Sequence, residues 1–359
     1  MSSREGAHRS AVLLSIVVLT GCASTEGDGR SAASNMERLA LSAPEIIGRT
    51  SSPDGVVPLD GHRVIVADPR ERAVLLLGPG PEDRTVLGHE GRGPREYVLP
   101  QAAVPVGTDS ILILDLALRR FLPVRLPSLA VGEATSLPDT LWNAKPIGTD
   151  RSGRIFFEKD VDLRGRTRIG PGDSSSVFRW DPATAVVVEL VRLDATDRQQ
   201  QASTVATSSG TTTIRMFVPE PFSRSDEWGV LPDGRLLIVR ATPFAIEVVD
   251  TTGTVERRWS PPGFEASMSN RSETPGPVAI DRSMRVSPDG IAWLGLHGRA
   301  ESDSTTFLVL GPNADILGMV VLPVRQQLIA LGQGYAVIGE KDQDDLSVIS
   351  VIQVDYRSP

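Results

Sequence analysis

Beyond residue 36 the chain repeats one pattern, in which a turn containing Gly or Asp is followed at once by a short apolar run. The pattern occurs six times, at Gly61–Ala67, Asp109–Leu114, Gly153–Phe157, Gly234–Val239, Gly290–Leu294 and Gly334–Ile338. β-Branched and apolar residues fill each run, and no convincing amphipathic helix pattern interrupts the series. The pattern therefore predicts an all-β chain built from six similar units.

Most of these strands are followed by a second hairpin. Tight turns at Gly78–Pro81, Asp181–Thr184, Asp250–Gly253 and Gly311–Ala314 follow apolar runs, and the last three lead into a further run. Gly and Asp suit such turns because they adopt the required backbone angles at little cost. The first turns of the six units begin at residues 61, 109, 153, 234, 290 and 334, so the intervals are 48, 44, 81, 56 and 44 residues.

These intervals fit a β-propeller, in which a four-stranded blade takes about 40–50 residues. We predict a six-bladed β-propeller of four-stranded antiparallel blades over residues 36–359. A jelly roll or a pair of β-sandwiches is the alternative, but neither gives a reason for six similar units. Two polar stretches, Asp194–Gly210 and Pro261–Pro277, are expected to be surface insertions rather than a seventh blade.

The last unit supplies only three strands, within Gln327–Tyr356. A propeller has to close, because an open sheet leaves reactive edges. The segment Met36–Gly48 precedes the first unit and contains four large aliphatic side chains. We expect this segment to add the outer strand of the last blade.

The first 35 residues follow a different pattern. Basic residues at the start precede the run Ala11–Leu19, which is too short to span a bilayer, since that takes about 20 residues. The run ends in Leu19-Thr20-Gly21-Cys22, and Cys22 is the only cysteine of the chain. The arrangement resembles a bacterial lipoprotein signal. An ordinary signal peptide that ends near a cysteine is the alternative.

The lipoprotein resemblance implies cleavage after residues 1–21 and acylation of Cys22, for example with palmitate, which would anchor the chain to a membrane. Residues 22–35 are then expected to be a flexible tether, because residues 23–35 contain no large apolar side chain. In the lipoprotein pattern an aspartate after the cysteine favours the inner membrane. Ala23 stands there, so we expect the outer membrane of the cell envelope, facing the periplasm or the exterior.

Charge narrows the range of partners. Removing residues 1–21 leaves 37 − 2 = 35 basic and 45 − 1 = 44 acidic residues, a net charge of −9. So acidic a chain is a poor candidate for nucleic-acid binding, which rewards basic patches. Acylation of the single cysteine leaves no disulfide, so stability has to come from a large core.

One short motif carries a family resemblance. Glu90-Gly-Arg-Gly-Pro-Arg-Glu-Tyr97 resembles the Gly-Pro-Gly-Glu-Phe turn of bacterial six-bladed β-propeller lipoproteins, which are relatives of NHL-repeat proteins. Arg95 stands where glycine is usual, and Tyr97 where phenylalanine is usual. The resemblance implies a fold and a location more than a reaction.

The same loop supplies the candidate binding residues Arg92, Arg95, Glu96 and Tyr97. Backbone N–H groups of a glycine-rich loop can bind an anion. The competing interpretation, which we favour, is a turn between blades with Tyr97 packed between two sheets. A second basic feature is an alternating stripe of arginines, Arg164, Arg166 and Arg168. It indicates either a patch that binds anions or lipid head groups or a solvated hairpin.

Signals for catalysis are weak. The chain has no nucleophile-elbow motif, its histidines lack zinc-ligand spacing, and Asp-Gly and Asp-Pro turns explain most of its prominent aspartates. Calcium-dependent propeller lactonases use asparagines and acidic residues around the channel, and here the asparagines are few. We therefore predict no catalytic residue, no metal site and no cofactor. The residues weighed are His62, His89, His297, Asp68, Asp150, Asp233, Asp289, Asn143, Asn270 and Asn313.

The sequence thus favours a non-enzymatic, membrane-anchored propeller scaffold that binds an unidentified ligand or protein partner at a loop-lined face. The alternative is an NHL-like metal-dependent hydrolase, such as a lactonase, or a lyase with a site in the central channel. A third interpretation is a structural partner in an envelope complex. An enzyme should converge several carboxylate, Asn or His side chains on one end of the channel, whereas a scaffold should show mixed polar residues there.

The lipid anchor is directly testable. The substitution Cys22→Ala should move the protein from the membrane to the soluble fraction, because it removes the acylated side chain. Fractionation checks the move, and mass spectrometry checks for the acyl group on the wild-type protein. Identical fractionation of both proteins, with no acyl group found, would contradict the anchor.

Overall fold

The structure is a computed structural model of the 359-residue chain. It describes residues 36–161, 168–169, 173–194, 198–207, 210–219, 226–241, 243–260, 284–296 and 303–356. The described residues contain no helix with the length and hydrophobicity of a membrane span. The predicted signal and tether, residues 1–35, lie outside the described residues.

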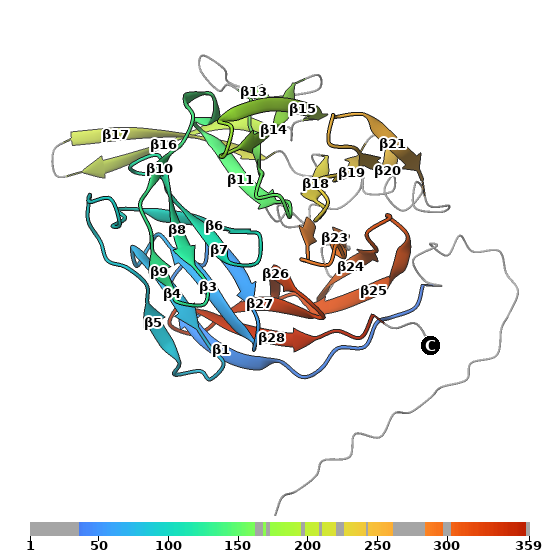
Figure 1. Ribbon diagram of the computed structural model, residues 1–359, viewed down its shortest axis with the longest axis horizontal. Coiled ribbons are helices and arrows are strands. Elements are labelled where there is room, and N and C mark those ends of the chain that lie inside the picture. Colours follow the sequence, from blue (N-terminus) through green and yellow to red (C-terminus); the bar gives the residue numbers. More distant parts are fainter. Residues whose placement is uncertain are drawn as a thin grey trace, which may run out of the picture. The chain divides into compact units, whose positions relative to one another are not determined.

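The first three blades are antiparallel sheets that follow one another along the chain (Figure 1). Blade 1 contains β2 (Gly55–Leu59), β3 (Arg63–Asp68), β4 (Ala73–Leu77) and β5 (Arg84–Val86). Blade 2 contains β6 (Pro100–Val106), β7 (Ser110–Asp115) and β8 (Arg120–Arg125), and its outer strand is split into β9 (Ala130–Val131) and β10 (Thr135–Ser136). Blade 3 contains β11 (Ala144–Thr149), β12 (Ile155–Lys159), β14 (Ser174–Asp181) and β15 (Val186–Asp194).

The other three blades repeat this order. Blade 4 contains β18 (Glu227–Val230), β19 (Leu236–Ala241), β20 (Phe244–Val249) and β21 (Val255–Trp259). Blade 5 contains β22 (Met284–Val286), β23 (Ala292–Leu296), β24 (Ser304–Leu310) and β25 (Ile316–Pro323). Blade 6 contains β26 (Gln327–Gly332), β27 (Tyr335–Lys341), β28 (Ser347–Gln353) and, from the other end of the chain, β1 (Glu45–Thr50).

The six blades form a closed ring. The innermost strands β2, β6, β11, β18, β22 and β26 each contact the next, and β26 contacts β2. The chain is therefore a six-bladed β-propeller, as predicted from the repeat. All six predicted turn-and-strand units correspond to the second strand of a blade, and the turns before β19 and β23 place Gly234 and Gly290 at a φ of 89°, which favours glycine.

The core lies between neighbouring blades, because each strand alternates its side chains between the two faces of its sheet. Between blades 6 and 1, for example, Val64 and Leu75 pack against Val337 and Ile349, all of them fully buried. Hydrogen bonds also join neighbouring blades, such as the bond of 2.7 Å from the Tyr335 hydroxyl to the Leu59 carbonyl.

Strand β1 closes the ring as the outer strand of blade 6. It pairs antiparallel with β28, from Glu45 opposite Val351 to Thr50 opposite Ser347. The strand was expected within Met36–Gly48, and the paired segment, Glu45–Thr50, begins inside that range and ends two residues beyond it. Earlier in the expected segment, Arg38 and Leu41 form isolated bridges to Met319 and Val354.

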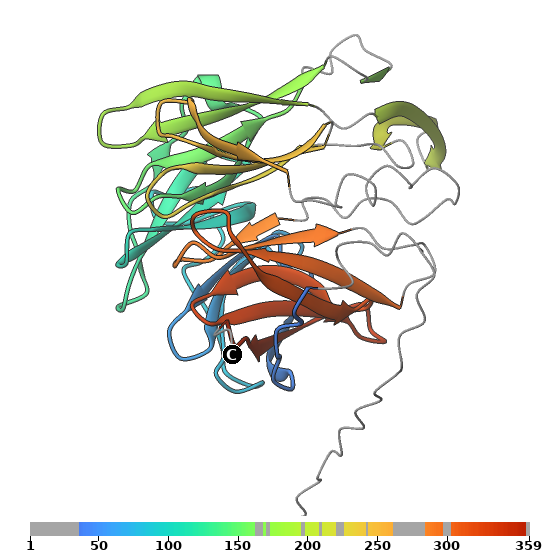
Figure 2. The ribbon, with the colours of Figure 1, turned by 90° about the vertical axis from the view of Figure 1, so that its right-hand side faces the viewer.

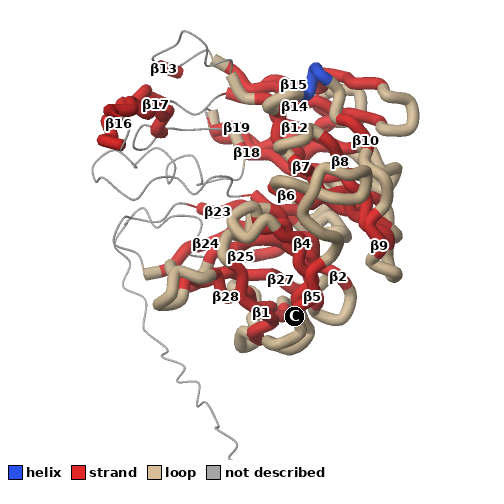
Figure 3. The backbone as a smooth tube through the Cα atoms, turned by 90° about the vertical axis from the view of Figure 1, so that its left-hand side faces the viewer, coloured by secondary structure: helices blue, strands red, loops and turns tan. Residues whose placement is uncertain are grey.

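The stretch between blades 3 and 4 is an insertion, as predicted, but it is more ordered than its polarity suggested. Strands β16 (Arg198–Thr207) and β17 (Gly210–Pro219) form a long hairpin, and β13 (Arg168–Ile169) pairs with β16. Threonine and other β-branched residues in β17 favour a strand even on a polar surface. Figures 2 and 3 show this small sheet displaced to one side of the ring.

The remaining expectations on connections are settled only in part. The predicted insertion Pro261–Pro277 lies outside the described residues, as do Arg164, Arg166 and the side chain of Arg168. Within the described part of the chain, helical structure is limited to a three-residue 3-10 helix, η2 (Asp139–Leu141), drawn in blue in Figure 3.

Two neighbouring isoleucines of β1 test the closure. The side chain of Ile47 is fully buried between blades 6 and 1, whereas that of Ile46 is 47% exposed. Ile47→Ala should lower the free energy of unfolding by about 2–5 kcal/mol, because it leaves a cavity. Ile46→Ala, the matched control, should change it by about 0.5 kcal/mol or less. Urea denaturation measures both, and equal losses would contradict a closing role for β1.

Candidate functional site

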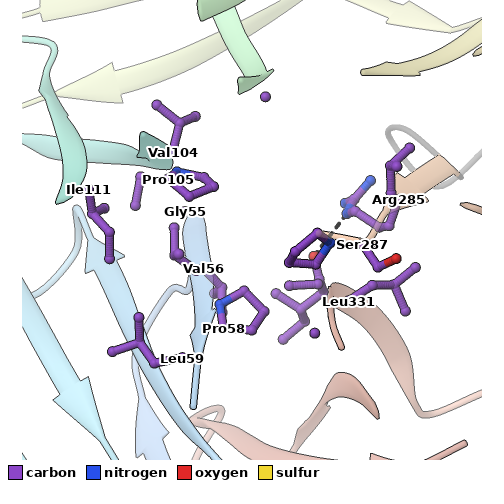
Figure 4. Close-up of a pocket in the computed structure, with 18 of the residues that line it drawn as sticks. Gly55, Val56, Pro58, Leu59, Val104, Pro105, Ile111, Arg285, Ser287 and Leu331 are labelled. Carbon is purple, nitrogen blue, oxygen red and sulfur yellow. Dashed lines mark hydrogen bonds between the residues drawn. The ribbon is translucent and has the colours of Figure 1, made fainter. Parts of the chain in front are cut away.

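The innermost strands enclose a cavity of about 2070 Å³ along the centre of the ring. All six strands contribute to its lining, and Figure 4 shows Val56, Pro58 and Pro105 on one side with Arg285 and Leu331 on the other. Drug-sized ligands usually occupy about 300–1,000 Å³, so this channel can hold a larger molecule or a smaller one with water.

The middle of the channel wall is largely apolar. Val56 and Pro58 of β2, Ala103 of β6, Ile147 of β11 and Ile329 of β26 all line it. Each of these side chains is only partly buried, so it offers apolar surface to whatever fills the channel. The wall can therefore stabilise an apolar group by removing it from water.

Backbone groups of the innermost strands also face the channel, because the inner edge of each blade has no neighbouring strand. Prolines stand in three of these strands, at positions 58, 105 and 146, where a missing N–H does not weaken the sheet. Besides the Leu59 carbonyl, two other carbonyls of innermost strands accept hydrogen bonds from a neighbouring blade. The Thr149 hydroxyl donates to the Pro105 carbonyl, and Arg285 Nε donates to the Ile329 carbonyl over 2.9 Å.

The two ends of the channel differ. All innermost strands begin at one end, near Asp54, Lys145 and Gln327; we call this end the loop face. They all end at the other, near Asp60 and Asp109, where the first hairpin turn of each blade lies; we call this end the turn face. The described ends of the two longest stretches between blades lie at the loop face, because each stretch follows the outer strand of one blade and precedes the innermost strand of the next. They run from Asp194 to Asp226 and from Ser260 to Met284.

Charge is distributed unevenly between the two ends. Among the described lining residues, the loop face has four cationic side chains and two carboxylates, and the turn face has two cationic side chains and three carboxylates. The loop-face set is Lys145, Arg285, Arg325, Lys341, Asp54 and Glu340; the turn-face set is Arg63, Arg151, Asp60, Asp109 and Asp150. At the loop face the channel lining thus has more cationic side chains than carboxylates.

Arg285 is held in place at the loop face. In addition to the bond to Ile329, its Nη1 atom donates to the Met284 carbonyl over 2.9 Å. The guanidinium therefore bridges the innermost strands of blades 5 and 6. Because an arginine is always protonated in proteins, this arrangement fixes a positive charge beside the channel.

Two aspartates at the ends of second strands are structural. The fully buried carboxylate of Asp68 accepts hydrogen bonds from the Thr50 hydroxyl and from the N–H groups of Ser51, Ser52 and Glu71, the last three over 2.8–2.9 Å. Burial raises the pKa of this carboxyl, but the hydrogen bonds outweigh burial and lower it below its usual value. In blade 2 the buried carboxylate of Asp115 likewise accepts hydrogen bonds, from the N–H groups of Val98 and Leu99, which precede β6.

The other predicted turn aspartates also serve the backbone. Asp150 accepts N–H groups of its own turn and pairs with Arg154 over 2.6 Å. Asp233 pairs with Arg235 over 2.7 Å, and Asp289 accepts from the Ser287 hydroxyl. Each of these three carboxylates therefore has a partner within its own turn.

The glycine-rich loop between blades 1 and 2 is held by its own residues. Tyr97 is 2% exposed, and its hydroxyl accepts the Val74 N–H and donates to the Leu87 carbonyl. Burial raises the pKa of this hydroxyl. Tyr97 thus packs between the two blades, which matches the turn interpretation.

Glu96 occupies the position that an external anion would need in this loop. Its carboxylate accepts the Gly93 N–H over 2.7 Å, and this bond lowers the pKa of the carboxyl. His89 Nε2 lies 3.3 Å from Glu96 Oε1, and Arg120 donates to the backbone carbonyls of Gly93 and Glu96. The backbone donor is therefore already used within the loop.

The arginines of this loop point to solvent. Arg92 and Arg95 are exposed, and Arg95 Nη2 lies 3.8 Å from Glu133 Oε1. Neither lines the central cavity. Binding at Arg92, Arg95, Glu96 and Tyr97 stays a prediction.

Candidates for metal binding are scattered. His62 and His89 lie in or near turns and are partly or largely exposed, while His297 and Asn270 lie outside the described residues. Asn143 is exposed before β11, and Asn313 lies in the hairpin turn before β25. In the part of the chain that the structure describes, no three His, Cys, Asp or Glu side chains are grouped to hold a metal ion.

Sequence reasoning missed a buried ionic cluster at the junction of blades 3 and 4. Arg240 donates to Asp226 over 2.7 Å and to Glu247 over 2.9 Å. Burial lowers the pKa of Arg240, but these carboxylates outweigh burial and raise it. Asp226 also accepts the Asp194 N–H, so the cluster holds together both ends of the connection that carries β16 and β17. The sequence signal that could have revealed this cluster is an arginine and a glutamate on the two strands of one hairpin, Arg240 on β19 and Glu247 on β20.

No protein-family model matches the chain, and no curated protein matches it either. Solved structures that resemble it include virginiamycin B lyase from Staphylococcus aureus, with 12% identity, 88% of this chain and 99% of that chain covered, and a TM-score of 0.44. A member of the DUF4221 family from Bacteroides vulgatus is 10% identical, with 89% of this chain and 97% of that chain covered and a TM-score of 0.45. The calcium-binding protein regucalcin from Agrobacterium tumefaciens is 13% identical, with 87% of this chain and 96% of that chain covered and a TM-score of 0.46. Such values are too low to transfer an activity.

The hydrogen bonds to Asp68 can be tested by pH. Asp68→Asn should lower the free energy of unfolding at pH 7 by about 2–3 kcal/mol, because the amide cannot accept all these donors. The folded pKa of Asp68 lies below its ordinary 3.8, so its stabilisation is full above pH 3.8 and disappears as the pH falls through the lower folded value. The difference between variant and wild type should therefore shrink below pH 3.8.

The exposed Asp109 provides the control for this measurement. Asp109→Asn should change the free energy of unfolding by about 0.5 kcal/mol or less at either pH. Urea denaturation at pH 7 and pH 3 gives both values. A penalty for Asp68→Asn that does not depend on pH would contradict the role of its charge.

Proposed function

We propose that this propeller is a lipid-anchored protein of the cell envelope that binds a ligand in its central channel, without catalysis. The observation that carries the proposal is the coincidence of two features at the loop face. The open channel of about 2070 Å³ reaches that face, and the two longest connections between blades join the propeller there. Binding residues gather on loops that a rigid scaffold positions, so this face is the one we assign to the ligand.

The lining of the channel supports binding rather than hydrolysis. Each mouth mixes cationic side chains with carboxylates, and the wall between them is mostly apolar. Ligand sites are typically apolar cavities with a few polar groups that fix orientation. The aspartates near the turns, including Asp150, already accept hydrogen bonds from their own turns.

The proposed anchor is compatible with this role. Met36, the first described residue, packs against the core beside blades 4 and 5. The tether proposed for residues 22–35 would have 14 residues and would span at most about 50 Å when fully extended. The acylated Cys22 would then keep the channel near the membrane, in our proposal the outer membrane.

A blocked channel tests the proposal. Gln327 is exposed at the loop-face mouth, so Gln327→Trp should obstruct the channel without disturbing the core. Val255→Trp is the matched control, because Val255 is 46% exposed on β21 and does not line the channel. Native mass spectrometry of the full, lipidated protein, extracted from its own membrane, should show a bound species in wild type and control that Gln327→Trp loses. Equal occupancy in all three proteins would contradict channel binding.

A further inference from the structure

We propose that the channel ligand is an amphiphilic anion, with its acidic head group at the loop face and its apolar part along the channel wall. This inference rests on the proposed function, since it needs a ligand in the channel. Three observations carry it: the charge at the loop-face mouth, the kind of cationic residues found there, and the apolar wall behind them.

The charge observation sets the sign of the head group. Among the described lining residues, the loop-face mouth has four cationic side chains and two carboxylates. The turn-face mouth has two cationic side chains and three carboxylates. Because the whole chain carries a net charge of −8, a locally basic mouth is a departure from its average surface. Low-dielectric walls around such a mouth focus its field, which raises the local concentration of anions.

The cations themselves are of two useful kinds. The chain has only three lysines, and two of them, Lys145 and Lys341, line this mouth. Lys341 Nζ also donates to the carbonyls of Ser51 and Asp345 and lies 3.5 Å from Asp345 Oδ1, so Lys145 and the arginines are the main candidates for the head group. The third, Lys159, ends β12 on the same face. Arg285 adds a guanidinium fixed by two backbone carbonyls. Ammonium and guanidinium groups form strong, charge-assisted hydrogen bonds to carboxylates and phosphates.

The wall sets the rest of the ligand. Behind the mouth lie Val56, Pro58, Ala103, Ile147 and Ile329, which offer no charged group. The prolines also remove N–H donors from the inner edge of their strands. A small inorganic anion would leave this wall in contact with water, whereas an attached hydrocarbon chain would cover it. The shared chemistry is therefore an acidic group on an apolar chain, as in a fatty acid or a lipid phosphate.

Photo-crosslinking in membranes tests this ligand class. The full, lipidated protein is placed in phosphatidylcholine vesicles and exposed to dodecyl phosphate or dodecanol, each carrying a diazirine at the end of its chain. The phosphate should reach half-saturation at a concentration about tenfold lower than the alcohol, because only it forms charge-assisted bonds at the mouth. The labelled peptides should come from the innermost strands.

Paired variants locate the head group. Lys145 and Arg325 are both exposed, so the double variant Lys145→Gln, Arg325→Gln should fold and should reduce the preference for phosphate to about twofold or less. Arg151→Gln, an exposed lining residue at the turn face, should keep the full preference. Urea denaturation confirms that each variant is folded.

The outcomes separate the two proposals. Equal labelling by both probes would overturn the anionic ligand and leave channel binding intact. No labelling of the innermost strands by either probe would overturn both. A preference that survives the double variant, or that Arg151→Gln removes equally well, would overturn the position of the head group.

Discussion

The whole structure depends on the pairing of β1 with β28, which joins one end of the folded chain to the other. A ring of blades closes only when the last blade is linked to the first, which leaves short, protected strand edges. Thr50 ends β1 opposite Ser347 of blade 6, and its hydroxyl donates to the buried Asp68 of blade 1. Because the same closure sets the spacing of the innermost strands, it also fixes the width of the channel.

The fold was predictable because its signal is local. Each blade places a turn directly before an apolar second strand, so a unit such as Gly234–Val239 is visible without knowledge of the rest of the chain. The limits of β1 were less predictable, since Glu45–Thr50 carries a register shift between Ile46 and Gly48 that no local pattern marks. The order of β16 and β17 was also missed, because hairpin pairing satisfies backbone groups whatever the polarity of the side chains.

The channel could not be read from the sequence, because its lining comes from six strands that are distant along the chain. Lys145 and Lys341 line the same mouth, but nothing in the sequence around either lysine marks it as part of a shared site. The glycine-rich loop shows the opposite case. Its motif is conspicuous in the sequence, yet the Gly93 N–H is used by Glu96 of the same loop, so a local motif here reports on packing between blades.

Buried and turn polar residues have different structural roles at the two faces of the propeller. On the turn face, carboxylates such as Asp150 and Asp233 accept bonds within their own turns and pair with the following arginine, which makes this face a rigid support. On the loop face, the buried cluster of Asp226, Arg240 and Glu247 holds the base of a long connection. A scaffold that is rigid at one face can change its loops at the other without loss of the fold, because the blades do not depend on them. Our proposal therefore assigns recognition to the loop face, where the channel opens beside the cationic lining residues.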